Sequence, residues 1–380
     1  MQSYHELLFD PILFIIYNHT FVLILAYLRS FIKVSRRTIL GIAPMISIVA
    51  QPFFGYISDK YKTIKGLLLF LYFAVIAISF SIFFSTSFII VFISFVAFHF
   101  VMSPAGPLLD SMAIKSLGSK KRDQYGKIRL WGSVGFAFTA VVSGPILGFI
   151  GIRNIYILFW ILILLLISLT LFLKDNNHST DPVSLQGVKE VLTNKGFIIF
   201  LFLCFLVMIP HRMNDTMLVL HLEDLGATTF LVGVAWALAA FSEVPVFYFL
   251  TQKVLQFHHL FLLGIVAMFF TIRWLLYAFI QSAEWIVFFQ ISQGLTFGLF
   301  WLVALQTAVS FVPNHLRSTG QALLMSTCFG LGGAVGGTAG GAILDNFGSQ
   351  TMYQLMAAMT FLAMIGIFTS YKLKQSSVEG

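Results

Sequence analysis

The sequence predicts an all-α membrane protein with twelve transmembrane helices arranged as two six-helix halves. First, 58% of its 380 residues are hydrophobic, only 10% are charged, and the mean hydropathy is +0.92. A soluble core cannot bury that much apolar surface, so the solvent must be lipid. Second, apolar segments long enough to cross a bilayer recur along the whole chain. Third, segments of the first half resemble segments of the second half.

The hydropathy pattern places the twelve spans. A helix rises about 1.5 Å per residue, so roughly 20 apolar residues cross about 30 Å of hydrocarbon. The predicted spans are 10–28, 38–58, 66–84, 88–114, 127–148, 154–173, 196–220, 230–250, 260–280, 284–308, 318–343 and 351–372. The first span lacks the preceding charged region and small-residue cleavage site of a signal peptide, so we expect it to be retained.

The loop charges predict the orientation. With both termini in the cytoplasm, sixteen Lys and Arg residues lie in inner loops and the tail, and five lie in outer loops. Cytoplasmic loops carry such an excess, so we expect cytoplasmic N- and C-termini in a bacterial-type inner membrane. Four cations at 29–37 are an exception. The net charge of +8 therefore reflects topology and does not indicate a nucleic-acid surface. Cys204 and Cys328 lie in separate apolar spans and indicate no disulfide framework.

The chain repeats itself with an offset near 190 residues. AQPFFGYISDK (50–60) and EVPVFYFLTQK (243–253) share a proline and the final lysine, and GPILGFIG (144–151) and GAILDNFG (341–348) share Gly, Ile, Leu and Gly. We therefore expect an N-terminal half at 1–173, a cytoplasmic linker at 174–195 and a C-terminal half at 196–380. Parallel halves of this kind are a transporter architecture, with the substrate site between them near mid-bilayer.

The loop GYISDKYKTIK (55–65) resembles the Gly-x-x-x-Asp-(Arg/Lys)-x-Gly-(Arg/Lys) loop of the major facilitator superfamily, although Lys62 stands where glycine is usual. The resemblance implies the major facilitator fold and makes Asp59 and Lys60 candidate gating residues. From about residue 45 onward, the chain resembles the lactose permease and phenylpropionate permease branch of proton symporters. The segments that carry this resemblance are PLLDSMAIK (107–115), YGKIRLWGSVGF (125–136), EVPVFYF (243–249), RWLLYAF (273–279) and QGLTFGLFW (293–301).

A candidate substrate site lies in the first half. His99, Ser103, Gly106 and Asp110 fall on one face of the fourth span. Asp110 lies about two turns before the cytoplasmic exit of that span, and Arg129 lies about two turns after re-entry. A charge at the centre of a membrane helix costs roughly 2.5–3.5 kcal/mol, so we expect these two residues to pair. The guanidinium fork suits a carboxylate and a ligand oxygen, which makes Asp110, Arg129 and His99 candidate substrate ligands.

The resemblance supports this pair, because an acid and an arginine at matching positions hold the sugar in lactose permease. A purely structural ion pair that closes the cytoplasmic end is the alternative.

Glu243 and Arg273 are the candidate proton-coupling residues in the second half. Glu243 follows the apolar stretch LVGVAWALAAFS (231–242), and its repeat counterpart is Ala50, so the fold itself does not demand an acid there. Arg273 is its expected partner, although helical rise places Arg273 roughly 10 Å nearer the outer face. A static buried pair is the alternative.

Two further groups of polar residues lie in the second half. On the seventh span, Arg212 and Asp215 are three residues apart, so they can pair, and they are candidate gating residues or a locally neutralised pair. On the tenth span, Gln290, Gln293 and Trp301 suit hydrogen bonding and stacking of a polar organic ligand. Lactose permease has a His and a Glu for proton handling there, whereas this chain has Gln293 and Thr296. Its proton coupling must therefore differ or be absent.

These features predict a secondary active transporter that imports a small polar organic solute together with protons by alternating access. The related branches take sugars, nucleosides or aromatic acids, so the resemblance does not fix the solute. The chain shows no metal-ligand spacing, nucleotide-binding glycine loop or hydrolytic triad, so we expect no enzyme activity, no cofactor and no metal. We expect a monomer whose partners are its solute, protons and membrane lipid.

Two alternatives stay open. GPILG (144–148) resembles a Gly-Pro signature of proton antiporters in the same superfamily, which favours an exporter. A non-transporting sensor or assembly factor with this fold is the second alternative.

Overall fold

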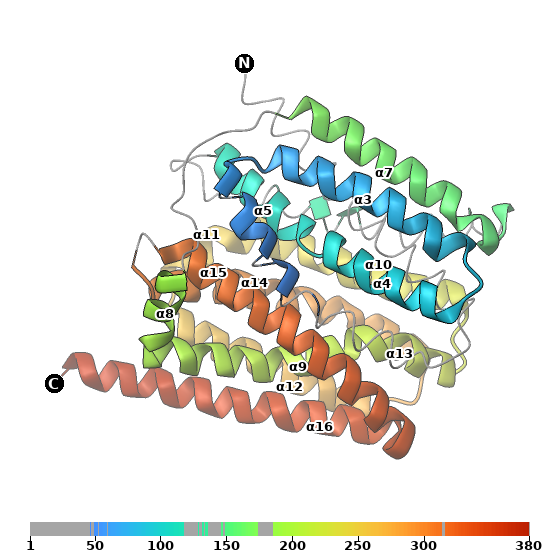
Figure 1. The fold of residues 1–380 in the computed structure, drawn as a ribbon. Helices are drawn as coiled ribbons and strands as arrows, with labels where there is room; N and C mark the ends of the chain where they lie inside the picture. The colour runs from blue at the N-terminus through green and yellow to red at the C-terminus, as the bar shows by residue number, and fades with distance from the viewer. Residues whose placement is uncertain are drawn as a thin grey trace. The chain divides into compact units, whose positions relative to one another are not determined.

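A computed structural model gives the arrangement of most of the chain. It describes residues 46, 49–51, 53–58, 60–117, 128, 131–132, 134–135, 146, 149–173, 185–313 and 316–379. Within these ranges the regular elements are helices (Figure 1). The predicted span 10–28 and most of the spans 38–58 and 127–148 lie outside the described residues.

Long apolar helices account for the predicted spans that the structure describes. The described residues contain eight stretches that are long and apolar enough to cross a membrane: Lys65–Phe84, Ile89–Met112, Ile155–Phe172, Lys195–Asp224, Phe230–Leu250, His259–Phe279, Ala283–Ser310 and Thr319–Leu373. The last covers two predicted spans. Large apolar side chains such as Phe172 and Phe279 are mostly exposed on these helices, as contact with lipid requires. The prediction of an all-α, multi-pass membrane protein is confirmed.

The chain divides into two compact units, Met1–Pro182 and Val183–Gly380. The boundary between them falls inside the polar stretch 174–195. Part of that stretch, Leu185–Thr193, forms the short amphipathic helix α8. Helix α8 packs against α9 (Lys195–Asp224) and α15 (Arg317–Met325), both of the second unit.

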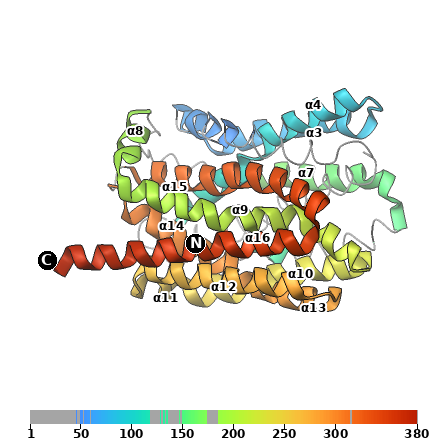
Figure 2. The same ribbon diagram turned by 90° about the horizontal axis from the view of Figure 1, so that it is seen from below.

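The first unit is built around α3. Its helices are α3 (Lys65–Phe84), α4 (Phe88–Met102), α5 (Ala105–Leu117), η2 (Ile152–Asn154) and α7 (Ile155–Phe172). Helix α3 packs against α4 and α7 (Figures 1 and 2). The indole N–H of Trp160 donates to Ser79 Oγ at 2.8 Å and ties α7 to α3. Lys65 Nζ donates to the carbonyls of Leu171 and Leu173 at 2.7 and 2.8 Å, so a cation caps the C-terminal end of α7.

The predicted span 88–114 is a broken helix. Helix α4 ends at Met102 and α5 begins at Ala105, with a turn at Ser103 and Pro104. Pro107 has no N–H, so the Ser103 carbonyl loses the donor that it would have in a continuous helix. Gln51 Nε2 donates to this carbonyl at 3.5 Å. The break therefore places polar groups inside an apolar segment.

The second unit packs along its last helix. Helix α16 lies against both α9 and α12 (Figures 1 and 2). It turns at Gly348, where a φ of 78° suits glycine, and this turn separates the two predicted spans 318–343 and 351–372. After α9, the elements are α10 (Thr229–Pro245), η3 (Val246–Leu250), α11 (Thr251–Lys253), η4 (Val254–Gln256), α12 (His259–Phe279), α13 (Ala283–Phe289), η5 (Gln290–Ser292), η6 (Gly294–Gly298), α14 (Leu299–Ser310), α15, η8 (Ser326–Leu331) and α16 (Gly332–Glu379).

Helix α10 and segment η6 touch backbone to backbone. The segments η3, η6 and η8 are π-helical, and such wide turns free backbone groups from the regular helix ladder. The Gly294 N–H donates to Ser242 Oγ at 2.9 Å, and a Cβ at Gly294 would overlap the Ser242 carbonyl oxygen. A Cβ at Gly298 would lie 3.5 Å from Glu243 Cγ, which is an ordinary contact. Glycine at position 294 thus allows the close approach of α10 and η6.

Candidate functional site

A buried guanidinium is the centre of the polar residues in the second unit. Arg273, on α12, is 2% exposed. Its Nη1 donates to Gln293 Oε1 at 2.5 Å and to Thr296 Oγ1 at 2.9 Å. Its Nη2 donates to Gln290 Oε1 at 2.6 Å and to the Tyr277 hydroxyl at 3.5 Å. We call these five residues the Arg273 network.

The Arg273 network fixes the orientation of two amides. Gln290, Gln293 and Thr296 recur every three residues through η5 and η6, so they face the same neighbour, α12. A guanidinium has only donors, so both glutamines must turn their oxygens toward Arg273 and their NH₂ groups away from it. Gln290 Nε2 is buried and has no hydrogen-bond partner among the described residues. The network therefore holds an amide donor with unused capacity inside the membrane.

Aromatic rings surround the same guanidinium. Its central carbon lies 5.0 Å from the ring centroid of Trp274 and 5.4 Å from that of Tyr277. Tyr353 of α16 packs against both rings, and its hydroxyl donates to Asn214 Oδ1 of α9 at 3.1 Å. Desolvated cation–π contacts stabilise a buried charge by about 2 kcal/mol. The rings therefore help to keep a cation in an apolar setting and connect it to α9.

Glu243 lies within the predicted span 230–250. It is 9% exposed on α10, beside Gly298. Within the described ranges, the Arg273 guanidinium donates its hydrogen bonds to amide and hydroxyl oxygens. The Glu243 carboxylate is not among these acceptors. The arrangement thus differs from the expected pairing of Glu243 with Arg273. The physical reason is that η6 contacts two different helices: Gly298 of η6 lies beside Glu243 of α10, whereas Thr296 of η6 accepts from Arg273 of α12.

A second polar cluster lies on α9. Arg212 Nη1 donates to Asp215 Oδ2 at 2.7 Å, so the two residues that the sequence spacing allows to pair form an ion pair. His211 Nε2 lies 3.7 Å from the same carboxylate oxygen. The His211 ring is buried and stacks on Phe297 with centroids 4.6 Å apart and planes 15° apart. The Arg212 guanidinium lies over the ring of Phe329 at 5.3 Å.

Trp301 is close to this second cluster. It is 2% exposed, and its ring packs edge to face against Phe329 with centroids 4.9 Å apart. Its contact with the Arg212 region therefore runs through Phe329. A stacking contact between Trp301 and a ligand would require a side-chain movement.

The first unit contains part of the predicted substrate site. His99 is buried on α4 and packs edge to face on Phe95 with centroids 4.7 Å apart. Asp110 lies partly buried on α5. At the break between these helices, Ser103 Oγ and Gln51 Oε1 are buried without a hydrogen-bond partner in the described part of the chain. Polar groups therefore collect around the broken fourth span.

Some predicted site residues lie outside this description. Arg129 and Asp59 are not among the described residues, so the structure gives no geometry for the predicted pairing of Asp110 with Arg129. Lys60 is described and exposed, with Nζ 5.6 Å from the ring of Tyr61.

The sequence reasoning missed several residues of these clusters. Tyr277 could have been found, because it lies one helical turn after Arg273. Phe297 and Phe329 contact His211 and Arg212 from other elements, and apolar residues inside apolar spans give no signal of such contacts. The contact between Ser242 and Gly294 likewise joins residues 52 apart.

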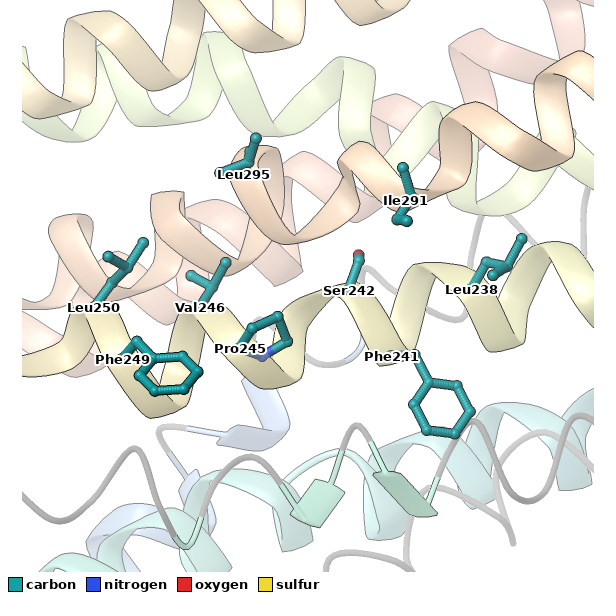
Figure 3. A pocket seen from close by; sticks show the side chains of 9 residues that line it. All are labelled: Leu238, Phe241, Ser242, Pro245, Val246, Phe249, Leu250, Ile291 and Leu295. Atoms are coloured by element: carbon teal, nitrogen blue, oxygen red, sulfur yellow. The ribbon is translucent and has the colours of Figure 1, made fainter.

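An apolar pocket of about 530 Å³ lies between α10–η3 and η5–η6. Figure 3 shows Ser242, Val246 and Leu250 pointing toward the helix that carries Ile291 and Leu295. Ser242 is the polar member of the lining, and its hydroxyl already donates to the Ala239 carbonyl and accepts from Gly294. The pocket therefore offers little to a polar solute.

Together, the fold and these clusters define a class of protein. Ionisable and amide side chains buried inside membrane helices are costly and mark solute or ion pathways. Two compact units of membrane helices are the organisation of a secondary transporter. The chain belongs to the MFS_1 like family of the major facilitator superfamily, whose profile matches residues 26–355.

Relatives in this superfamily are similar over most of their length. The chain is 28% identical over 341 residues to the uncharacterised transporter YwbF of Bacillus subtilis, covering 88% of this chain and 84% of that protein. It is 26% identical over 378 residues to the maltose permease of Geobacillus stearothermophilus, covering 98% of this chain and 95% of that protein. The resemblance to the superfamily is confirmed, and the relatives are transporters and not enzymes. The particular branch stays a prediction.

Solved structures show the same fold. The nucleoside transporter NupG matches with a TM-score of 0.71 and 14% identity, covering 97% of this chain and 99% of that chain. A variant of NupG matches with a TM-score of 0.75 and 15% identity, covering 98% of this chain and 100% of that chain. At these identities the likeness concerns the fold alone.

Proposed function

We propose that this chain is a secondary active transporter that imports a small polar organic solute together with protons by alternating access. The observation that carries the proposal is the Arg273 network, a hydrogen-bonded set of polar side chains buried inside membrane helices. Such groups are expensive in a bilayer unless they serve a pathway. The proposed setting is a bacterial-type cytoplasmic membrane, with a monomer whose termini both face the cytoplasm.

The proposed solute is a sugar, a nucleoside or an aromatic acid. The names of the relatives support the first two, because one is a maltose permease and one is a nucleoside transporter. Amide groups with fixed orientation, such as those of Gln290 and Gln293, suit hydroxyl and carbonyl groups of such solutes. In this proposal Asp110, Arg129 and His99 contribute from the first half.

Glu243 is the proposed proton carrier. In the Arg273 network, Gln290, Gln293 and Thr296 cannot exchange protons near neutral pH. Among the described residues, a buried carboxyl on α10 is therefore the better candidate for titration. Asp59 and Lys60, with Arg212 and Asp215, are proposed to gate the two sides of the pathway.

Uptake into proteoliposomes under imposed pH gradients tests this function. The solutes are maltose, uridine and 3-phenylpropionate, which represent the three proposed classes. An inward proton gradient should drive accumulation of at least one of them. Outward movement under the same gradient would indicate an exporter. No movement of any solute in either direction would favour the non-transporting alternative.

A further inference from the structure

The ion pair on α9 uses only part of its bonding capacity. Within the described ranges, one side-chain hydrogen bond joins Arg212 to Asp215, from Nη1 to Oδ2. A guanidinium and a carboxylate can share two parallel bonds, so this arrangement leaves Oδ1 and Nη2 with capacity to spare. The two side chains are 30% and 21% exposed, so both are accessible. A donor and an acceptor therefore lie next to each other at an accessible position inside a membrane helix.

The pair is supported by aromatic rings. The Arg212 guanidinium lies 5.3 Å above the ring of Phe329, and Phe329 is held by Phe297 and Trp301 through edge-to-face contacts. The buried His211 ring stacks on Phe297 and approaches Asp215 Oδ2 from within the unit. These contacts occupy one side of the pair and restrict the two side chains to a narrow range of positions.

The backbone beneath the pair is also fixed. A Cβ added at Gly336 of α16 would lie 2.7 Å from the Ile209 carbonyl oxygen, 2.9 Å from the Met213 nitrogen and 3.1 Å from Arg212 Cβ. Helix α16 therefore approaches α9 as closely as glycine allows at this position. A site held in this way loses little conformational entropy when it binds a ligand.

The chemistry of the pair selects one kind of ligand group. A hydroxyl can donate and accept, so one hydroxyl can donate to Asp215 Oδ1 while its neighbour accepts from Arg212 Nη2. Two hydroxyls on adjacent carbons have the spacing for both bonds. An anionic ligand would have to compete with Asp215 for the guanidinium, and a cationic one with Arg212 for the carboxylate. The pair is neutral overall, which favours a neutral ligand.

We propose that Arg212 and Asp215 form a subsite for a vicinal diol on the transported solute. This inference rests on the proposed transport function and goes beyond gating, because it gives the pair direct contact with the solute. Sugars and ribonucleosides both carry this group.

Calorimetric binding to the purified full-length chain in lipid nanodiscs tests the subsite. The probes are maltose and uridine, which carry vicinal diols, 2′-deoxyuridine, which lacks the ribose diol, and 3-phenylpropionate, which lacks hydroxyls. The chain should bind maltose or uridine, and uridine binding should exceed 2′-deoxyuridine binding by roughly tenfold, the effect of one unpaired polar group at a partly buried site. If maltose is the ligand, its binding should weaken by about the same factor in the variants below.

The variants are Arg212→Lys, which keeps the charge but loses the fork, and Asp215→Asn, which keeps the size but loses the charge. Either should remove most of the diol preference. Glu284→Gln is the matched control, because its carboxylate is exposed at the start of α13 and bonds Ser282. A double variant, Arg212→Gln with Asp215→Asn, keeps the net charge and serves where a single variant fails to fold.

The outcomes separate the subsite from the transport function. Undiminished diol binding in the folded variants would overturn the proposed subsite. Arg212 and Asp215 would then keep only their proposed gating role. Absence of binding for both maltose and uridine at millimolar concentration also overturns it. If 3-phenylpropionate is nevertheless imported, the transport function stands without the subsite.

Discussion

Arg273 Nη1 lies 2.5 Å from Gln293 Oε1, so a buried cation on α12 donates a hydrogen bond to a neutral amide twenty residues later in the chain. With Gln290 bound to the other Nη, two amides share one charge. Neither amide can take up or release a proton near neutral pH, so the charge at this point is fixed. Proton coupling therefore requires a different group.

Arg273→Lys should destabilise the chain. An ammonium is a compact point charge and cannot span both glutamine oxygens, so at least one buried acceptor loses its donor. The expected cost is about 1–3 kcal/mol, measured as a lower midpoint of thermal unfolding in detergent. Arg212→Lys is the matched control, because Arg212 is 30% exposed and makes one side-chain hydrogen bond among the described residues, so its loss should be smaller. Equal midpoints for Arg273→Lys and the unmodified chain would contradict the network.

Gly294→Ala should destabilise the contact between α10 and η6. The added Cβ would overlap the Ser242 carbonyl oxygen, which is backbone and cannot move without shifting α10. Overpacking of this kind costs about 1–3 kcal/mol. Gly298→Ala is the matched control on the same segment, since its Cβ meets Glu243 Cγ at 3.5 Å. Thermal unfolding of the two variants checks this prediction, and a similar loss in both would show that glycine itself, and not the contact, is required.

Glu243→Gln should mimic a permanently protonated carboxyl. In a symporter, uptake driven by a proton gradient should be abolished, whereas exchange of internal for external solute should continue, because exchange needs no deprotonation. The two rates are measured in the same proteoliposomes with whichever solute is imported. Glu284→Gln, an exposed carboxylate at the start of α13, should leave both rates unchanged. Retention of gradient-driven uptake in Glu243→Gln would move the assignment to Asp110 or Asp215.

Arg129→Lys should weaken solute binding while the chain stays folded. Lysine keeps the positive charge of the proposed pair with Asp110, but it loses the two-pronged donor that can hold a carboxylate and a ligand oxygen together. The loss should be about tenfold or more, measured by calorimetry with an imported solute. Unchanged affinity would reduce the pair to a structural role.

The sequence by itself determined the membrane class, the fold family and the approximate spans. Hydropathy predicts these features because each bilayer-crossing helix must satisfy its own backbone hydrogen-bonding groups and present apolar side chains over a fixed length. It also indicated the pairing of Arg212 with Asp215, because residues three apart on a helix are neighbours whatever surrounds them.

Only the tertiary structure decided which distant groups meet. Arg273 and Glu243 were the natural pair by charge, yet the guanidinium bonds Gln290 and Gln293. The packing of η6 against both α10 and α12, and not charge, determines which atoms come within reach. The contact of Gly294 with Ser242 depends on how two helices cross. The placement of Arg212 over Phe329 depends in the same way on the packing of α9 against η8. Packing between elements far apart in sequence leaves no periodic signal, so these relationships appear only once the helices are assembled.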